Sequence, residues 1–166
     1  MATRSEQVKQ FTEQSSGRTL PTHPRKMTRQ EVEFLIRMNL GELMELLVTV
    51  LDGQENVIQV MHTLIDKAEV PTFQAEGKDD VEIMAEQADA LVDIDYYNLN
   101  GAAKVGFNED DVFAEVQRAN MNKKSPIDGQ FHRNNDGKVL KPEGWREPDI
   151  KAVIRRWQQQ GSWSKS

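Results

Sequence analysis

LGELMELLVTVL, residues 40–51, is a stretch in which every residue is large and apolar apart from Gly41, Glu42, Glu45 and Thr49. A helix that is apolar on nearly all sides is normally buried. Glu42 and Glu45 stand three residues apart, so they fall on one face of such a helix. Two buried carboxylates are costly to ionise unless cations or hydrogen-bond donors meet them. The stretch therefore predicts a buried helix that carries a paired acidic group.

A second acidic motif follows in EQADALVD, residues 86–93. Glu86, Asp89 and Asp93 are separated by three and then four residues, which places them on one helical face. Carboxylates that converge from two helices suit a hard divalent cation with oxygen ligands, above all Mg²⁺. Two other interpretations stay open: a solvated acidic face, and acids paired internally with Arg or Lys. The motifs thus make a metal site a hypothesis beside two structural ones.

Composition and size limit the class of protein. The chain has 166 residues, enough for one domain with a real core, and 37% of them are hydrophobic. No run approaches the roughly 20 apolar residues of a membrane helix, and no apolar segment of a signal peptide follows Met1. The absence of cysteine excludes disulfides, thiolate nucleophiles and cysteine-rich zinc sites. We therefore expect a cytoplasmic protein with no membrane partner.

The charge balance bears on the ligands. There are 27 acidic against 21 basic residues, a net charge of −6. This argues against binding a nucleic-acid polymer, because such proteins normally present a basic face. A small anionic ligand is compatible with the charge if a metal offsets it locally. The last third of the chain gathers Lys123, Lys124, Lys138 and Lys141.

The sequence divides into three parts. Residues 1–26 are polar and contain Ser-Ser-Gly and two prolines, which predicts a flexible arm. Basic residues outnumber acidic ones there, so a transit peptide is the alternative. Residues 27–160 form the predicted domain, and residues 161–166 a polar tail.

Start and stop signals predict four main helices. Thr28 and Glu31 form a capping box that opens a helix to about Leu51, which should end at Asp52-Gly53. The other three cover residues 55–67, residues 81–104 with a stop at Gly106, and a segment that Asn108 opens. Beyond them, residues 134–137 (NNDG) predict a β-hairpin, and a last helix should run from 148 to about 160.

With these elements in place, the chain resembles the all-α nucleoside triphosphate pyrophosphohydrolases of the MazG and phosphoribosyl-ATP pyrophosphohydrolase type. That group carries an ExxE on one helix and an ExxD on another, here residues 42–45 and 86–89. More specific are EQADALVDIDY, GFNEDDVFAEVQRANMNKK and DGKVLKPEGWREPDI, and the likeness runs from about Met27 to Ile150. It implies an all-α fold, a four-helix bundle with a short C-terminal hairpin and helix, that associates as a homo-oligomer, either a dimer or a tetramer.

The resemblance also implies roles for individual residues. The metal ligands for Mg²⁺, with Mn²⁺ as a substitute, would be Glu42, Glu45, Glu86 and Asp89, and Asp93 would be a further ligand or would support one. Asn120 and Lys123 match positions that touch the nucleotide, and Lys138 is a weaker phosphate candidate. One departure is Gly41, which stands where MazG proteins often have another glutamate.

The activity that the resemblance implies is hydrolysis of a nucleoside or deoxynucleoside triphosphate to the monophosphate and pyrophosphate. Glu42 or Glu45 would orient or deprotonate the attacking water, and the sequence does not choose between them. Two alternatives stay open: hydrolysis of phosphoribosyl-ATP by the same site, and a non-catalytic helical interaction module whose acids face solvent.

Overall fold

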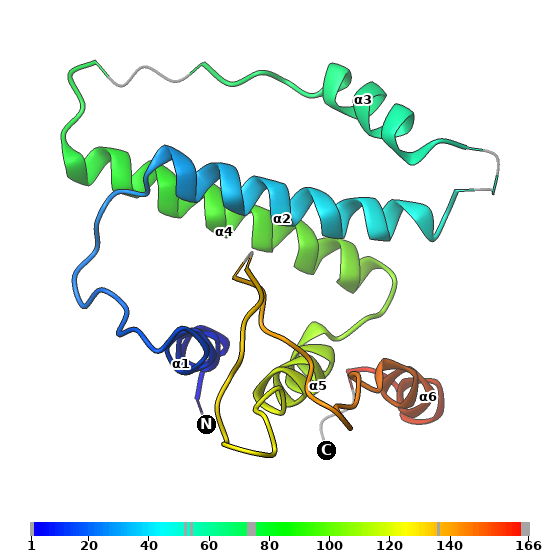
Figure 1. The fold of residues 1–166 in the computed structure, drawn as a ribbon. Coiled ribbons are helices and arrows are strands. Elements are labelled where there is room, and N and C mark those ends of the chain that lie inside the picture. The colour runs from blue at the N-terminus through cyan, green and yellow to red at the C-terminus, as the bar shows by residue number, and fades with distance from the viewer. Residues whose placement is uncertain (1, 52, 54, 73–75, 136, 164–166) are drawn as a thin grey trace. The chain divides into compact units, whose positions relative to one another are not determined.

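The structure, a computed structural model, describes the chain except residues 1, 52, 54, 73–75, 136 and 164–166 (Figure 1). Within that part the chain forms helices and no strands. The helices are α1 (Arg4–Ser16), α2 (Arg29–Val48), α3 (Val57–Lys67), α4 (Asp80–Lys104), α5 (Glu109–Met121) and α6 (Ile150–Gln160). The predicted all-α class is confirmed, whereas the four-helix bundle remains a prediction.

The helices fall into two compact units. Unit 1 comprises residues 1–23 and 92–166, and unit 2 comprises residues 24–91. Helix α4 contributes to both, because the division falls between Leu91 and Val92. None of the helices in the described part is both long and apolar enough to cross a membrane.

Helix α1 corrects the prediction of a flexible arm over residues 1–26. Thr3 and Glu6 form a capping box at its start, in which each side chain accepts from the other residue's backbone N–H. Gly17 ends the helix with φ of 65°, and its N–H donates to the Glu13 carbonyl at 2.9 Å. Gly17 therefore ends a helix as a left-handed cap and does not interrupt one.

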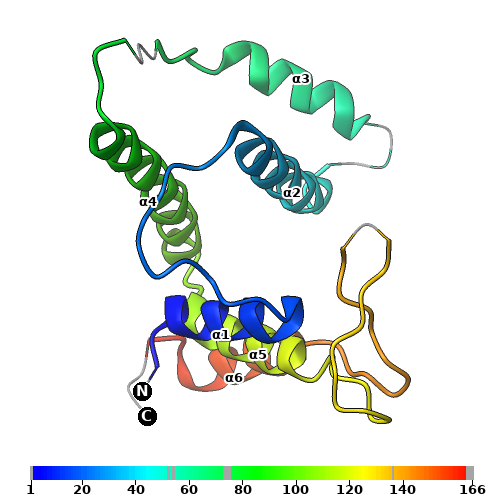
Figure 2. The same ribbon diagram turned by 60° about the vertical axis from the view of Figure 1, so that its left-hand side comes forward.

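Unit 1 has a small core around α5, which packs against α1 and α6 (Figure 2). Ala119, Val153 and Trp157 are its buried apolar residues in the described part of the chain. The Trp157 indole stacks on Phe107 with ring centroids 5.9 Å apart, and its Nε1–H donates to Asp111 Oδ2 at 2.8 Å. A buried indole whose N–H has a partner is the stable arrangement for tryptophan.

Unit 2 is built from α2, α3 and the first half of α4, and α3 doubles back along α2 (Figure 1). Thr28 and Glu31 form the predicted capping box. Helix α2 ends earlier than predicted, and its C-cap is Thr49 in a right-handed conformation. Asp52 of the predicted stop lies outside the described residues. No described residue of α2 or α3 is buried. The prediction of a buried α2 is thus wrong for a single chain.

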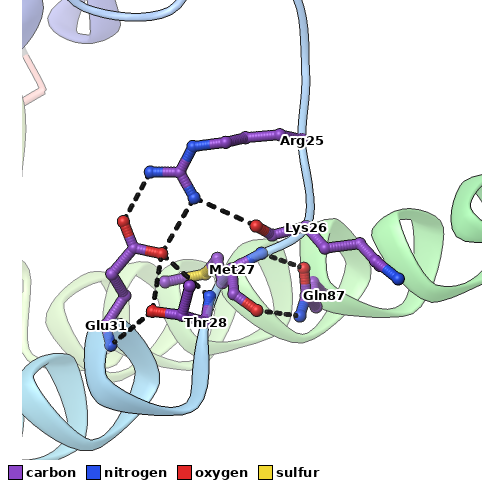
Figure 3. Close-up of polar contacts among 6 residues, drawn as sticks. All are labelled: Arg25, Lys26, Met27, Thr28, Glu31 and Gln87. Atoms are coloured by element: carbon purple, nitrogen blue, oxygen red, sulfur yellow. Dashed lines mark hydrogen bonds and ion pairs between the residues drawn. The ribbon is translucent and has the colours of Figure 1, made fainter.

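Polar contacts attach the start of α2 to α4 (Figure 3). The Met27 N–H donates to Gln87 Oε1 at 2.9 Å, and Gln87 Nε2 donates back to the Met27 carbonyl at 3.3 Å. Arg25 donates two hydrogen bonds to Glu31, at 2.9 and 2.5 Å. The Arg25 guanidinium, with the Thr28 backbone N–H, lowers the pKa of Glu31 from 4.5 to about 2. The capping glutamate of α2 is therefore held as an anion.

The remaining predicted start, stop and turn signals lie in unit 1. Gly106, with φ of 78°, follows the end of α4 as predicted, and the Asn108 side chain caps α5. Asp149 caps α6 one residue after the predicted start. The predicted hairpin is reduced to isolated antiparallel bridges, which join 124 to 131 and 133 to 139. The Asn134 N–H donates to the Lys138 carbonyl at 2.9 Å, and Asp136 of the predicted turn lies outside the described residues.

Candidate functional site

The two acidic motifs lie on α2 and α4. Glu42 and Glu45 share one face of α2, and both side chains are exposed. Glu86 and Asp89 lie on the part of α4 that belongs to unit 2, and they are exposed as well. Among the described residues, the side chains of Glu42, Glu45 and Asp89 have neither a hydrogen bond nor an ion pair. These carboxylates are therefore accessible to a cation.

Glu86 differs from the other acids because it already has a basic partner. The Lys78 ammonium forms an ion pair with its carboxylate, and the Glu86 side chain is 46% exposed. The neighbouring Gln87, inside the same motif, holds the Met27 backbone. A metal bound at Glu86 would have to share that carboxylate with Lys78 or displace the ammonium.

The single chain does not assemble the predicted metal ligands into one cluster. In the part of the chain that the structure describes, no three Asp, Glu or His side chains are placed to hold a metal ion. Asp93 also lies on α4, exposed, in the half that belongs to unit 1. The donor chemistry of the predicted set still fits Mg²⁺, since all of its members are carboxylates. The ligand set remains a prediction.

The predicted nucleotide-contacting residues are, in contrast, gathered in unit 1. Lys123 Nζ donates to Asn120 Oδ1 at 2.8 Å, near the end of α5. Burial lowers the pKa of Lys123, and the nearby charges of Lys141 and Lys138 lower it further. Asn120 and Lys123 are thus in contact, and the charges of Lys138 and Lys141 act on Lys123.

Two residues near Lys123 escaped the sequence-based prediction of a site. Trp145 is half-buried, and its Nε1–H donates to the Ala119 carbonyl at 2.7 Å. The Lys141 and Lys123 Nζ atoms lie 4.5 and 5.5 Å from the centroid of its ring. Lysine ammonium groups within about 6 Å of an aromatic ring are held there by cation–π attraction. The KPEGW segment contains Lys141 and Trp145, but no spacing rule links it to α5.

Comparison with known proteins gives a similarity among solved structures. No protein-family model matches the chain, and no curated protein matches it. Among solved structures, it is similar to the crystal structure of a "putative NTP pyrophosphohydrolase" from Exiguobacterium sp. 255-15, with a TM-score of 0.77 and 25% sequence identity. The similarity covers 95% of this chain and 98% of the other. The resemblance predicted from the sequence is confirmed. The all-α fold and the resemblance to NTP pyrophosphohydrolases are therefore supported by a solved structure as well as by motifs.

Proposed function

We propose that the chain is a Mg²⁺-dependent nucleotide pyrophosphohydrolase that converts a nucleoside or deoxynucleoside triphosphate to the monophosphate and pyrophosphate. The observation that carries the proposal is the similarity to the Exiguobacterium protein over nearly the whole length of both chains. The ExxE of α2 and the ExxD of α4, both in unit 2, support it. The cytoplasmic location expected from the sequence is part of the same proposal.

The carboxylates would bind the metal. Glu42, Glu45, Glu86 and Asp89 would be the ligands of Mg²⁺ or Mn²⁺, with Asp93 as an additional one. When bound, the metal would neutralise phosphate oxygens and lower the pKa of a water. Glu42 or Glu45 would accept a proton from the water as its oxygen attacks the α-phosphorus. The bond from the α-phosphorus to the bridging oxygen would break, and pyrophosphate would leave.

The polar groups of unit 1 would contact the nucleotide. Asn120 offers amide donors and an acceptor, and Lys123 and Lys138 are point cations suited to phosphate oxygens. The contact between Asn120 and Lys123 at the end of α5, and the effect of the Lys138 charge on Lys123, support this role.

We also propose that the protein works as a homo-oligomer, a dimer or a tetramer. Apolar side chains of unit 2 are widely exposed in the single chain: Leu46 is 66% exposed and Val50 is 77% exposed. Soluble proteins that work as monomers rarely leave large contiguous apolar surfaces uncovered. A second copy of the chain would cover such a surface and would bring further carboxylates near those of α2.

The decisive experiment is a panel of canonical and modified triphosphates, including dUTP, dCTP and phosphoribosyl-ATP, incubated with the full-length protein and Mg²⁺. We expect release of pyrophosphate and a monophosphate from at least one of them, abolished by EDTA. Turnover confined to phosphoribosyl-ATP would change the substrate and keep the reaction. If no triphosphate is hydrolysed, and Mg²⁺ does not raise the melting temperature beyond an ionic-strength control, the acids are a solvated face and the proposal is wrong.

A further inference from the structure

Two lysines lie close to one tryptophan in unit 1, and a third lysine lies near one of them. Lys141 and Lys123 place their ammonium groups 4.5 and 5.5 Å from the centre of the Trp145 ring. Lys138 lies close enough for its charge to act on Lys123. We call Lys123, Lys138, Lys141 and Trp145 the lysine–tryptophan cluster.

The cluster has little negative charge to balance it. In the described part of the chain, the one ion pair of these lysines joins Lys141 Nζ to Glu147 Oε1 at 3.5 Å. The two side chains are 55% and 79% exposed, and an ion pair so open to water is worth little. Ammonium groups held near one another repel, so an anion that bridges them would be favoured.

Polar contacts to α5 fix two residues of the cluster, Trp145 and Lys123. Trp145 Nε1–H donates to the Ala119 carbonyl, and Lys123 Nζ donates to Asn120 Oδ1. Of the three N–H donors on Lys123, the described residues use one, which leaves two for a ligand. Trp145 and Lys123 are thus held in place before any ligand binds, which reduces the ordering cost of binding for these two residues.

A purely structural explanation accounts for only part of this arrangement. Cations are favoured at the C-terminal end of a helix, and this explains Lys123 just beyond α5. Lys138 and Lys141 come from the following irregular segment, which has no such dipole. Their approach to a lysine that is already half-buried increases repulsion instead of relieving it.

We propose that the lysine–tryptophan cluster is a binding site for a polyphosphate anion, and that Lys141 and Trp145 belong to it together with Lys123 and Lys138. Point cations spread over several side chains match negative charge spread over linked phosphates better than that of a single phosphate. Such an anion has two sources, the triphosphate tail of a nucleotide and free pyrophosphate. This choice of ligand rests on the proposed function, whereas the presence of an anion site rests on the cluster alone.

The test is calorimetric titration of the full-length protein in EDTA, so that no metal contributes. The ligands are pyrophosphate, orthophosphate and a nucleoside triphosphate analogue with a methylene group between the α- and β-phosphorus. We expect pyrophosphate or the analogue to bind at least about 10-fold more tightly than orthophosphate, and added salt to weaken binding. K141A should weaken it about 10-fold. The matched control K151A, which removes an exposed lysine of α6, should leave it unchanged.

Each outcome bears on the proposal. If the wild type binds neither polyphosphate, or K141A and K151A bind them equally well, the inference is overturned. Preference for the analogue over pyrophosphate identifies the site with the triphosphate tail, and equal affinity identifies it with the linked phosphates alone. If the protein hydrolyses a triphosphate but binds no polyphosphate in EDTA, the proposed anion site is wrong and the proposed function stands. If polyphosphate binding depends on Lys141 but no triphosphate is hydrolysed, the anion site stands and the proposed function is wrong.

Discussion

The two units differ in how they handle their apolar side chains. In unit 1, Ala119 is 1% exposed, and Val153 and Trp157 are 8% exposed. In unit 2, no described residue is buried, and the apolar side chains of α2 and α3 line an open groove of about 500 Å³ that includes Leu43 and Leu64. The unit that carries Glu42, Glu45, Glu86 and Asp89, four of the five candidate metal ligands, is therefore the one with no buried residue among those described.

This difference means that apolar burial stabilises the two units in different ways. Removing apolar surface from water contributes roughly 25 cal/mol per Å², so the covered side chains of unit 1 stabilise it directly. The apolar faces of α2 and α3 gain that free energy only when something covers them. The comparison thus predicts that substitutions in unit 1 alter folding, whereas substitutions on the apolar face of unit 2 alter association.

The largest effect on folding should come from Trp157→Ala in unit 1. It removes a buried ring and its hydrogen bond to Asp111, and replacements of this kind cost about 3–5 kcal/mol. Denaturant unfolding would measure the loss. Trp163→Ala, at a side chain that is 61% exposed, is the control and should change stability by less than about 0.5 kcal/mol. Equal losses would mean that Trp157 does not belong to a core.

Glu45→Gln should next test the chemistry assigned to unit 2. The amide cannot act as a base and is a weaker metal ligand, so triphosphate hydrolysis should fall about 100-fold or more. The control is Glu33→Gln, also an exposed acid of α2, whose carboxylate pairs with Arg29. Pyrophosphate release would be compared at saturating Mg²⁺. A Glu45→Gln variant as active as Glu33→Gln would exclude Glu45 from the reaction.

Leu46→Asp should break the contrast between the units if a second copy covers unit 2. A charge on this exposed position would be buried in the proposed association, so the oligomer should dissociate toward the chain mass of 19.0 kDa. Light scattering after gel filtration would give the mass. Ile127→Asp, in unit 1 at a side chain that is 94% exposed, should leave the mass unchanged. A wild type that is monomeric at all concentrations would contradict the proposed association.

The smallest effect concerns acid stability. The pKa of Glu31 in unit 2 is lowered to about 2, mainly by Arg25, and that of Glu115 in unit 1 is lowered to about 2, mainly by Arg118. A lowered folded-state pKa stabilises the fold above the usual value near 4.5, and this stabilisation is lost as the pH falls toward 2.

Melting temperatures between pH 7 and pH 2 would measure the contribution of each glutamate. Glu31→Gln and Glu115→Gln should each reduce the fall in melting temperature between pH 7 and pH 2. The reduction should be small because both carboxylates are accessible to solvent. A decline of unchanged slope in both variants would show that neither carboxylate is linked to folding.

Local signals explain why much of the fold was predictable from the sequence. A capping box needs residues only three apart, so Thr28 and Glu31 identify the start of α2. The same signal at Thr3 and Glu6 also identifies the start of α1, but Gly17 and the serines before it are typical of a loop and favour the wrong prediction. The acidic motifs were located correctly on their helices, since helical spacing is also a local property.

The rest depends on contacts that a linear pattern does not encode. The apolar character of α2 says that the helix needs covering, but not whether the same chain covers it, and within one chain it stays exposed. The place of Trp145 in a cluster depends on its bond to Ala119, 26 residues earlier. Whether acids of α2 and α4 meet around a metal is a question of the same non-local kind.

Gln87 stands between Glu86 and Asp89, and its side-chain amide both accepts from and donates to the backbone of Met27. This pair of hydrogen bonds depends on side-chain length. In Gln87→Asn the side chain is one methylene shorter and would not reach the Met27 backbone. A shortened chain that began at Arg29 would leave the amide without either partner and would also remove the Thr28 cap. The residues just before α2 therefore help to hold the second acidic motif in position. Tags or truncations are better placed elsewhere on the protein.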